Sequence, residues 1–198
     1  IYDARGLPAL ECEITLEDGS YVSGSVPAGI SKGSHEAYEL RDGGQRLMGM
    51  GLQKAVENID SIIAPLLVGQ EPNLVSTDLS LIELDGTIEK SKLGANAMLA
   101  ASIATLRAQA SVENMEVYEL VGYLCEFSSV TLPFAMFNMI SGGAHAPGNM
   151  RIQECLVIPV GAQSFRASME ASVTLYHHLH ELLKKKLPYV CTSIEGAF

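Results

Sequence analysis

The chain has 198 residues, of which 47% are hydrophobic and 18% charged. This composition supports a sizeable core and excludes an intrinsically disordered protein. The formal net charge of −10 argues against nucleic-acid binding, which needs a basic face to meet the phosphates. Neither a secretory signal peptide nor an apolar run of membrane-spanning length is visible, so we expect a soluble cytoplasmic protein without a membrane span.

The four cysteines are widely and irregularly spaced, and none forms a Cys-x-x-Cys pair. This spacing gives little support to a zinc or redox site. We expect free, buried thiols in a reducing compartment.

The first part of the chain predicts a small α+β domain over residues 1–126. Residues 9–16 alternate apolar and acidic side chains, residues 17–20 have turn chemistry, and residues 21–26 return as a second strand. Apolar periodicity then predicts a hairpin sheet covered on one side by helices. These helices are expected at residues 52–67, at 76–84, from Asn96 onward and at 117–122.

A loop rich in small residues follows the hairpin at residues 27–36. Most such loops are ordinary surface connections, which composition alone favours here. The alternative is a mobile lid, in which Ser31 offers an oxygen to an anion or a metal.

The second part, residues 130–198, predicts three strands and one long helix. Strands are expected at residues 130–140, 155–158 and 190–198, and the helix at residues 164–186 with Ser164 as its N-cap.

A polar cluster precedes the middle one of these strands. His145 follows a Gly-Gly turn, and Gln153 with Glu154 opens the buried strand. A solvated strand end is one interpretation. The other is a site at which the three side chains converge on a polar ligand, because a buried carboxylate needs a partner.

Several motifs, in order and with matching gaps, resemble those of one family. They include Asp3-Ala4-Arg5-Gly6, Gly142-Gly143-Ala144-His145, Gln153-Glu154 and Glu195-Gly196. Further similar segments are residues 26–33, 36–42, 85–87, 90–97, 137–138 and 159–162. Together they are similar to the enolase family, glycolytic dehydratases of 2-phosphoglycerate.

The resemblance implies an α+β N-terminal domain followed by the first strands and helices of a TIM-type α/β barrel. A complete barrel takes about 250 residues, so residues 130–198 hold only its start. We therefore expect the chain to be part of a longer polypeptide. The implied activity is a magnesium-dependent lyase that reversibly converts 2-phosphoglycerate to phosphoenolpyruvate, and the implied assembly is a homodimer.

The resemblance also implies residue roles. Glu195 is expected as the general acid that helps hydroxide leave, with Glu154 as a second catalytic carboxylate. His145, Gln153 and Glu154 are expected to bind the substrate, and Ser31 to join the Mg²⁺ shell. The family's carboxylate metal ligands and its lysine base are expected outside this chain, so the 198-residue chain alone is expected to be inactive.

The sequence departs from the family pattern at several positions: Ile194 stands where an Asp is usual, Ala197 where a Gly is usual and Ser141 where an Asn is usual, and the loop at residues 28–33, which includes Lys32, is altered. These departures motivate an alternative function, a catalytically inactive enolase-like binding or structural protein.

Overall fold

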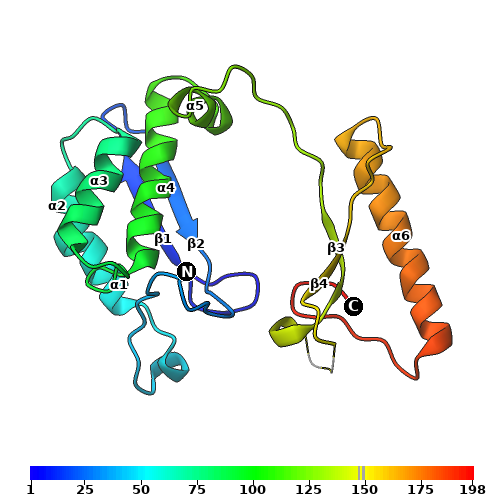
Figure 1. The fold of residues 1–198 in the computed structure, drawn as a ribbon. Coiled ribbons are helices and arrows are strands. Elements are labelled where there is room, and N and C mark those ends of the chain that lie inside the picture. The colour runs from blue at the N-terminus through cyan, green and yellow to red at the C-terminus, as the bar shows by residue number, and fades with distance from the viewer. Residues whose placement is uncertain (147, 149) are drawn as a thin grey trace. The chain divides into compact units, whose positions relative to one another are not determined.

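The computed structural model describes residues 1–146, 148 and 150–198 (Figure 1). It divides into two compact units, Ile1–Val130 and Thr131–Phe198, and each is described by itself. Within the described residues, no helix is both long and apolar enough to cross a membrane.

The predicted hairpin opens the first unit. Strand β1 (Leu10–Thr15) pairs antiparallel with β2 (Tyr21–Val26), with Leu10 opposite Val26. The alternation of β1 buries Leu10 and Cys12 and leaves Glu13 exposed. One face of the hairpin is therefore covered, as predicted.

The predicted helix at residues 52–67 is continuous but not uniform. It consists of α1 (Gln53–Asn58), a π-helical segment η2 (Ile59–Ile63) and α2 (Ala64–Leu67). Pro65 does not end it at once. The π-helical segment lies just before Pro65, which lacks an N–H and whose ring crowds the preceding turn.

Three longer helical elements complete this unit, namely α3 (Leu74–Asp85), α4 (Ala95–Val112) and α5 (Val117–Leu124), with a short 3₁₀ turn η1 at Arg46–Gly49. Helix α4 packs against both strands through alanines that are fully buried. The approach is so close that a Cβ on Gly24 of β2 would lie 2.5 Å from the carbonyl oxygen of Ala100. The small side chains of α4 allow this close packing.

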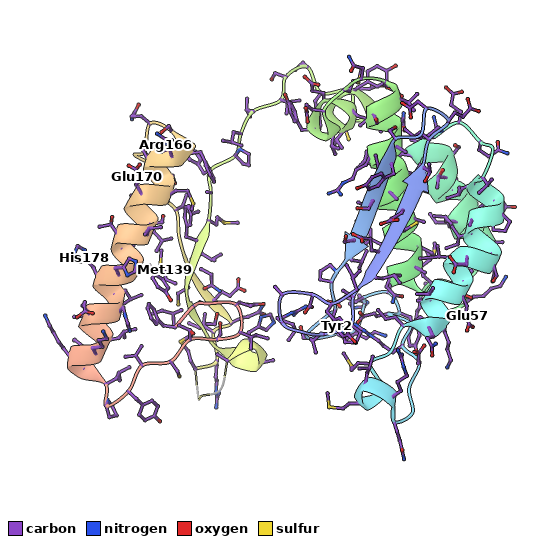
Figure 2. The ribbon with its side chains drawn as sticks, turned by 180° about the vertical axis from the view of Figure 1, so that it is seen from behind. Tyr2, Glu57, Met139, Arg166, Glu170 and His178 are labelled. Atoms are coloured by element: carbon purple, nitrogen blue, oxygen red, sulfur yellow. The ribbon has the colours of Figure 1, made fainter. Side chains whose placement is uncertain are left out.

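Among its described residues, the second unit has two strands and one long helix. Strand β3 (Phe137–Ser141) pairs antiparallel with β4 (Glu154–Val157), and α6 spans Phe165–Lys186. The Ser164 side chain caps α6 by accepting a hydrogen bond from the Ala167 N–H at 3.1 Å, as predicted. In Figure 2, Met139 of β3, which is 4% exposed, lies between the strand and α6.

One strand prediction in this unit began too early and another was wrong. Residues 130–136 are not part of a strand, and residues 190–198 form no strand. A strand needs a continuous ladder of backbone hydrogen bonds to a partner strand. In residues 190–198 only Phe198 bonds to a strand: its N–H donates to the Met139 carbonyl at 3.0 Å, and its carbonyl accepts from the Ser141 N–H at 2.8 Å. This is the pattern of a single parallel bridge to β3, and the described residues form no closed barrel.

The four cysteines are free, but the expectation that they are buried holds only for Cys12. Cys125, Cys155 and Cys191 are exposed.

Candidate functional site

Three of the predicted site residues converge in the second unit. The imidazole of His145 and the carboxylates of Glu154 and Glu195 each offer a ligand atom, and these atoms lie within 4.8 Å of one another. The closest measured pair is Nδ1 of His145 and Oε2 of Glu195, at 3.5 Å. We call these three residues the His–Glu–Glu cluster. Its members come from three different segments, so the fold of this unit assembles it.

The Gly-Gly turn places His145. The Gly142 N–H donates to the Gln153 carbonyl at 2.8 Å, and a Cβ on Gly142 would lie 2.5 Å from the Ile152 carbonyl oxygen. Only glycine allows this close approach. The chain then enters a 3₁₀ turn, η3 (Gly143–His145), which ends at the histidine. The side chain of His145 is 15% exposed, so it is largely fixed yet reachable.

Glu154 is the first residue of β4, and its backbone pairs with Ser141 at the end of β3. The adjacent Gln153 contributes its backbone carbonyl to Gly142. The Gln153 side chain is exposed, and within the described residues it makes no hydrogen bond in this structure. Its substrate-binding role stays a prediction.

Glu195 sits in a tight turn close to Phe198. The Ser193 N–H donates to the Ala197 carbonyl at 2.7 Å, and the Gly196 N–H donates to the Ser193 carbonyl at 3.0 Å. Ala197 is 2% exposed and anchors the turn. Ile194, at the position that departs from the family pattern, is 65% exposed.

Helix α6 holds this turn through two residues that the sequence did not single out for the site. The Tyr176 hydroxyl donates to the Gly196 carbonyl at 2.8 Å, and its ring stacks on Phe198 with centroids 4.5 Å apart. His180 also stacks on Phe198, at 5.3 Å. His177 and His178 on the same helix are exposed to solvent, whereas His180 is half-buried. The signal available in the sequence is helical spacing, which puts Tyr176 on the same face of the helix as Met169 and Val173.

Ser31 belongs to the first unit, in an exposed loop. The loop is held near its start, where the Arg5 guanidinium donates to the Ala28 carbonyl and also pairs with Asp3. The Lys32 ammonium lies over the ring of Tyr38, 5.1 Å from its centroid. Lys32, one of the departures from the family pattern, thus contacts a residue that lies just after the loop in the sequence. The metal-binding role of Ser31 stays a prediction.

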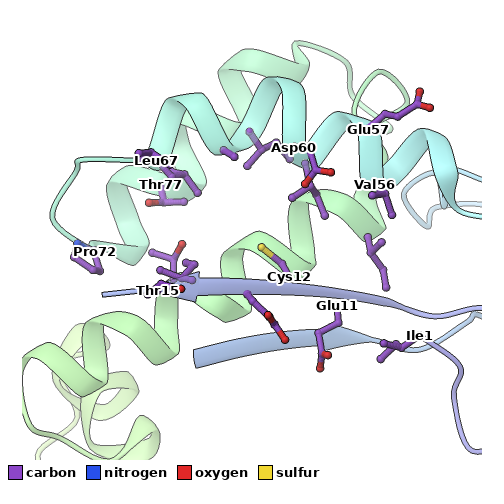
Figure 3. Close-up of a pocket in the computed structure, with 18 of the residues that line it drawn as sticks. Ile1, Glu11, Cys12, Thr15, Val56, Glu57, Asp60, Leu67, Pro72 and Thr77 are labelled. Carbon is purple, nitrogen blue, oxygen red and sulfur yellow. The ribbon is translucent and has the colours of Figure 1, made fainter. Parts of the chain in front are cut away.

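A separate groove lies in the first unit. It runs along β1 beside the helix Gln53–Leu67, with Cys12 pointing into it (Figure 3). None of the five predicted site residues, all of which the structure describes, lines this groove. The titratable side chains His145, Glu154 and Glu195 converge instead at the His–Glu–Glu cluster.

The donor set of the cluster defines what it can do. Two carboxylates and an imidazole can accept, hold and donate protons. Magnesium prefers an all-oxygen shell, and the His–Glu–Glu cluster is the only group of three potential ligands among the described residues. These residues do not by themselves fit a magnesium site.

Comparison with known proteins matches both units of the chain to one family. Residues 1–121 match the family model described as the enolase N-terminal domain, and residues 129–197 match the enolase C-terminal TIM barrel domain. The whole chain is 42% identical to Enolase 2 of Hevea brasiliensis, 41% to an enolase of Solanum lycopersicum and 42% to an enolase of Corynebacterium kroppenstedtii. It spans 46%, 47% and 46% of their lengths, about half of each. With both of its units matched, the chain belongs to the enolase family.

Proposed function

We propose that this chain is the first part of an enzyme that reversibly dehydrates 2-phosphoglycerate to phosphoenolpyruvate. The observation that carries the proposal is the His–Glu–Glu cluster, because the three residues expected to act on the substrate lie within 4.8 Å of one another. Family membership supports the reaction class.

Glu195 acts as the general acid in this proposal. Loss of the substrate's hydroxyl group needs a proton on the departing oxygen, and a carboxyl group on an exposed turn can deliver it. Glu154 and His145 face Glu195 across the site and bind the polar substrate beside it. The reverse reaction returns the proton to Glu195 from the attacking water.

The remaining groups are proposed to lie in the rest of the polypeptide. Magnesium needs carboxylate ligands beyond these residues, and the proton at C2 needs a base that this chain does not supply. Enzymes of the enolase superfamily use a lysine or a histidine as that base. We therefore propose that the 198-residue chain by itself has no turnover.

The test is phosphoenolpyruvate formation by the full-length protein in the presence of Mg²⁺. Glu195→Gln keeps the shape of the side chain and removes its acid, so kcat is expected to fall about 10²- to 10⁴-fold. Glu170→Gln on the exposed surface of α6 is the matched control and retains full activity. Wild-type protein that binds Mg²⁺ but forms no product would instead favour the second candidate, a catalytically inactive binding or structural protein, which the departures at Ile194 and Lys32 motivate.

We further propose that the full-length protein is a cytoplasmic homodimer, as the family resemblance implies. Light scattering of the purified protein measures the assembly, and cell fractionation measures the location. The intact mass of the native protein tests its length: a mass equal to that of this chain alone contradicts the proposal of a longer polypeptide.

A further inference from the structure

We propose that the His–Glu–Glu cluster is also a binding site for a transition-metal dication of the zinc class. This inference goes beyond the proposed function, in which the same three side chains meet the organic substrate and Mg²⁺ is held elsewhere. It rests on the donor types and the distances, and it stands whether or not the protein is a dehydratase.

The spacing is close to that of a bound ion. Zinc binds imidazole nitrogen and carboxylate oxygen at about 2.0–2.2 Å, so tetrahedral ligands lie roughly 3.4 Å apart. The ligand atoms of the cluster are all within 4.8 Å of one another, and His145 and Glu195 are already at 3.5 Å. The distances still to be closed are on the order of 1 Å, and glutamate side chains have several rotatable bonds.

Three protein ligands leave a fourth position free for water or a small anion. One histidine with two carboxylates is a set that zinc accepts, and three ligands plus an open position are typical of non-structural zinc sites. The imidazole nitrogen also selects among ions, because Mg²⁺ and Ca²⁺ prefer oxygen alone whereas Zn²⁺, Co²⁺ and Ni²⁺ bind imidazole well.

The backbone around the cluster is held before any ion arrives. Gly142 and Gln153 join the histidine turn to β4, the Phe198 bridge joins the glutamate turn to β3, and Tyr176 fixes Gly196. By contrast, the contact between His145 and Glu195 at 3.5 Å is longer than a good hydrogen bond. An ion therefore displaces only a weak interaction.

Bound zinc would occupy the Glu195 carboxylate and keep it from donating a proton. This consequence alone rests on the proposed function, and it predicts that zinc inhibits the dehydration at Mg²⁺ concentrations that saturate the enzyme.

The primary experiment titrates the full-length protein with Co²⁺ in excess Mg²⁺, and the coordination geometry separates the sites, because an all-oxygen Mg²⁺ site is octahedral whereas the cluster offers a tetrahedral one. Tetrahedral Co²⁺ absorbs visible light strongly, and the wild type is expected to develop this absorption and to lose it when Zn²⁺ is added. His145→Asn, Glu154→Gln and Glu195→Gln are each expected to weaken Co²⁺ binding at least ~10-fold, since each removes a direct ligand and even outer-shell partners are worth 10- to 100-fold. His178→Asn, on the exposed face of α6, is the control and binds Co²⁺ like the wild type.

A second measurement needs no variant. Chemical modification of histidines in the wild type, mapped by mass spectrometry, is expected to slow at His145 when Zn²⁺ is present and to continue at His178. Equal modification of His145 with and without Zn²⁺ would overturn the proposal, as would Co²⁺ spectra that are the same in the wild type and in all three cluster variants. Failure of the dehydratase assay leaves both measurements intact, so the two proposals fail separately.

Discussion

The hydroxyl of Tyr176 on α6 donates a 2.8 Å hydrogen bond to the backbone carbonyl of Gly196. This contact joins the long helix to the turn that carries Glu195. The turn is also fixed by the stacking of Tyr176 on Phe198 and by the backbone bonds between Phe198 and β3. The position of the proposed acid thus depends on a residue 20 positions away in the sequence from the carbonyl it binds.

Tyr176→Phe tests this dependence. The phenylalanine keeps the stacking and removes only the hydrogen bond, which contributes about 0.5–1.5 kcal/mol. We expect kcat of the full-length protein to fall about fivefold, as a loss of roughly 1 kcal/mol implies, with KM nearly unchanged. Steady-state kinetics with 2-phosphoglycerate measure both. Tyr189→Phe, at a residue that is 78% exposed, is the control; equal kinetics in the two variants contradict a positioning role for Tyr176.

Asp85 holds the connection after α3. Its side chain is 3% exposed and accepts hydrogen bonds from the backbone N–H groups of Thr87 at 3.0 Å and Leu93 at 2.8 Å, among others. Burial raises the pKa of this carboxyl, but the hydrogen bonds outweigh burial, and the net pKa is below its ordinary value.

Asp85→Asn replaces a charged acceptor with an amide that offers one oxygen. Hydrogen bonds to charged groups contribute about 1.5–3 kcal/mol, so we expect the free energy of unfolding to fall by about 2 kcal/mol in urea denaturation. Glu83→Gln, at an exposed position of the same helix, serves as the comparison and is expected to change it by less than about 0.5 kcal/mol. If the two variants unfold at the same midpoint, the network around Asp85 is not stabilising.

Asp3 predicts a specific acid dependence. Burial works to raise its pKa, but the Arg5 side chain and the backbone N–H groups of Leu7 and Arg5 overcome this and lower the pKa to about 2 from 3.8. Because the folded pKa is below the unfolded one, the stabilisation is present above about pH 4 and is lost as the pH falls toward about 2.

Thermal unfolding of the wild type and of Asp3→Asn across this range measures the effect. The two midpoints are expected to differ most above about pH 4 and to converge as the pH approaches about 2. Other carboxyl groups titrate alike in both proteins and cancel in the difference. A gap between the midpoints that stays constant down to the lowest pH of this range refutes the role given to Asp3.

Gly24 sets the distance between the hairpin and α4. A Cβ at this position would lie 2.5 Å from both the Ala100 oxygen and the Ala104 nitrogen, which belong to the helix backbone and cannot rotate away. Gly24→Ala is therefore expected to lower the free energy of unfolding by about 3 kcal/mol, at the upper end of the usual cost of overpacking. Gly161→Ala, where a Cβ meets nothing within 4 Å, is the control. Equal chemical denaturation midpoints in these two variants contradict the close packing.

The sequence by itself determined the elements whose signals are local. Hydrophobic periodicity and capping predicted α6 to within a residue of Phe165–Lys186, and the alternation around a turn predicted the hairpin of β1 and β2. Composition in α4 indicated its close packing. Local patterns could not predict the secondary structure of residues 190–198, because a strand forms only where a neighbouring strand provides backbone hydrogen bonds. In this segment only Phe198 makes such bonds to β3.

The residue types and the family resemblance named His145, Glu154 and Glu195, but no pattern in the sequence fixes the distances between atoms that are up to 50 positions apart. Only the tertiary structure decided that these side chains meet, because the Gly142 contact with Gln153, the pairing of β3 with β4 and the Phe198 bridge bring three segments together. Only the tertiary structure revealed that Tyr176 holds the Glu195 turn. Every residue has a backbone carbonyl, so the sequence of the turn does not indicate that one of its carbonyls accepts a hydrogen bond from α6.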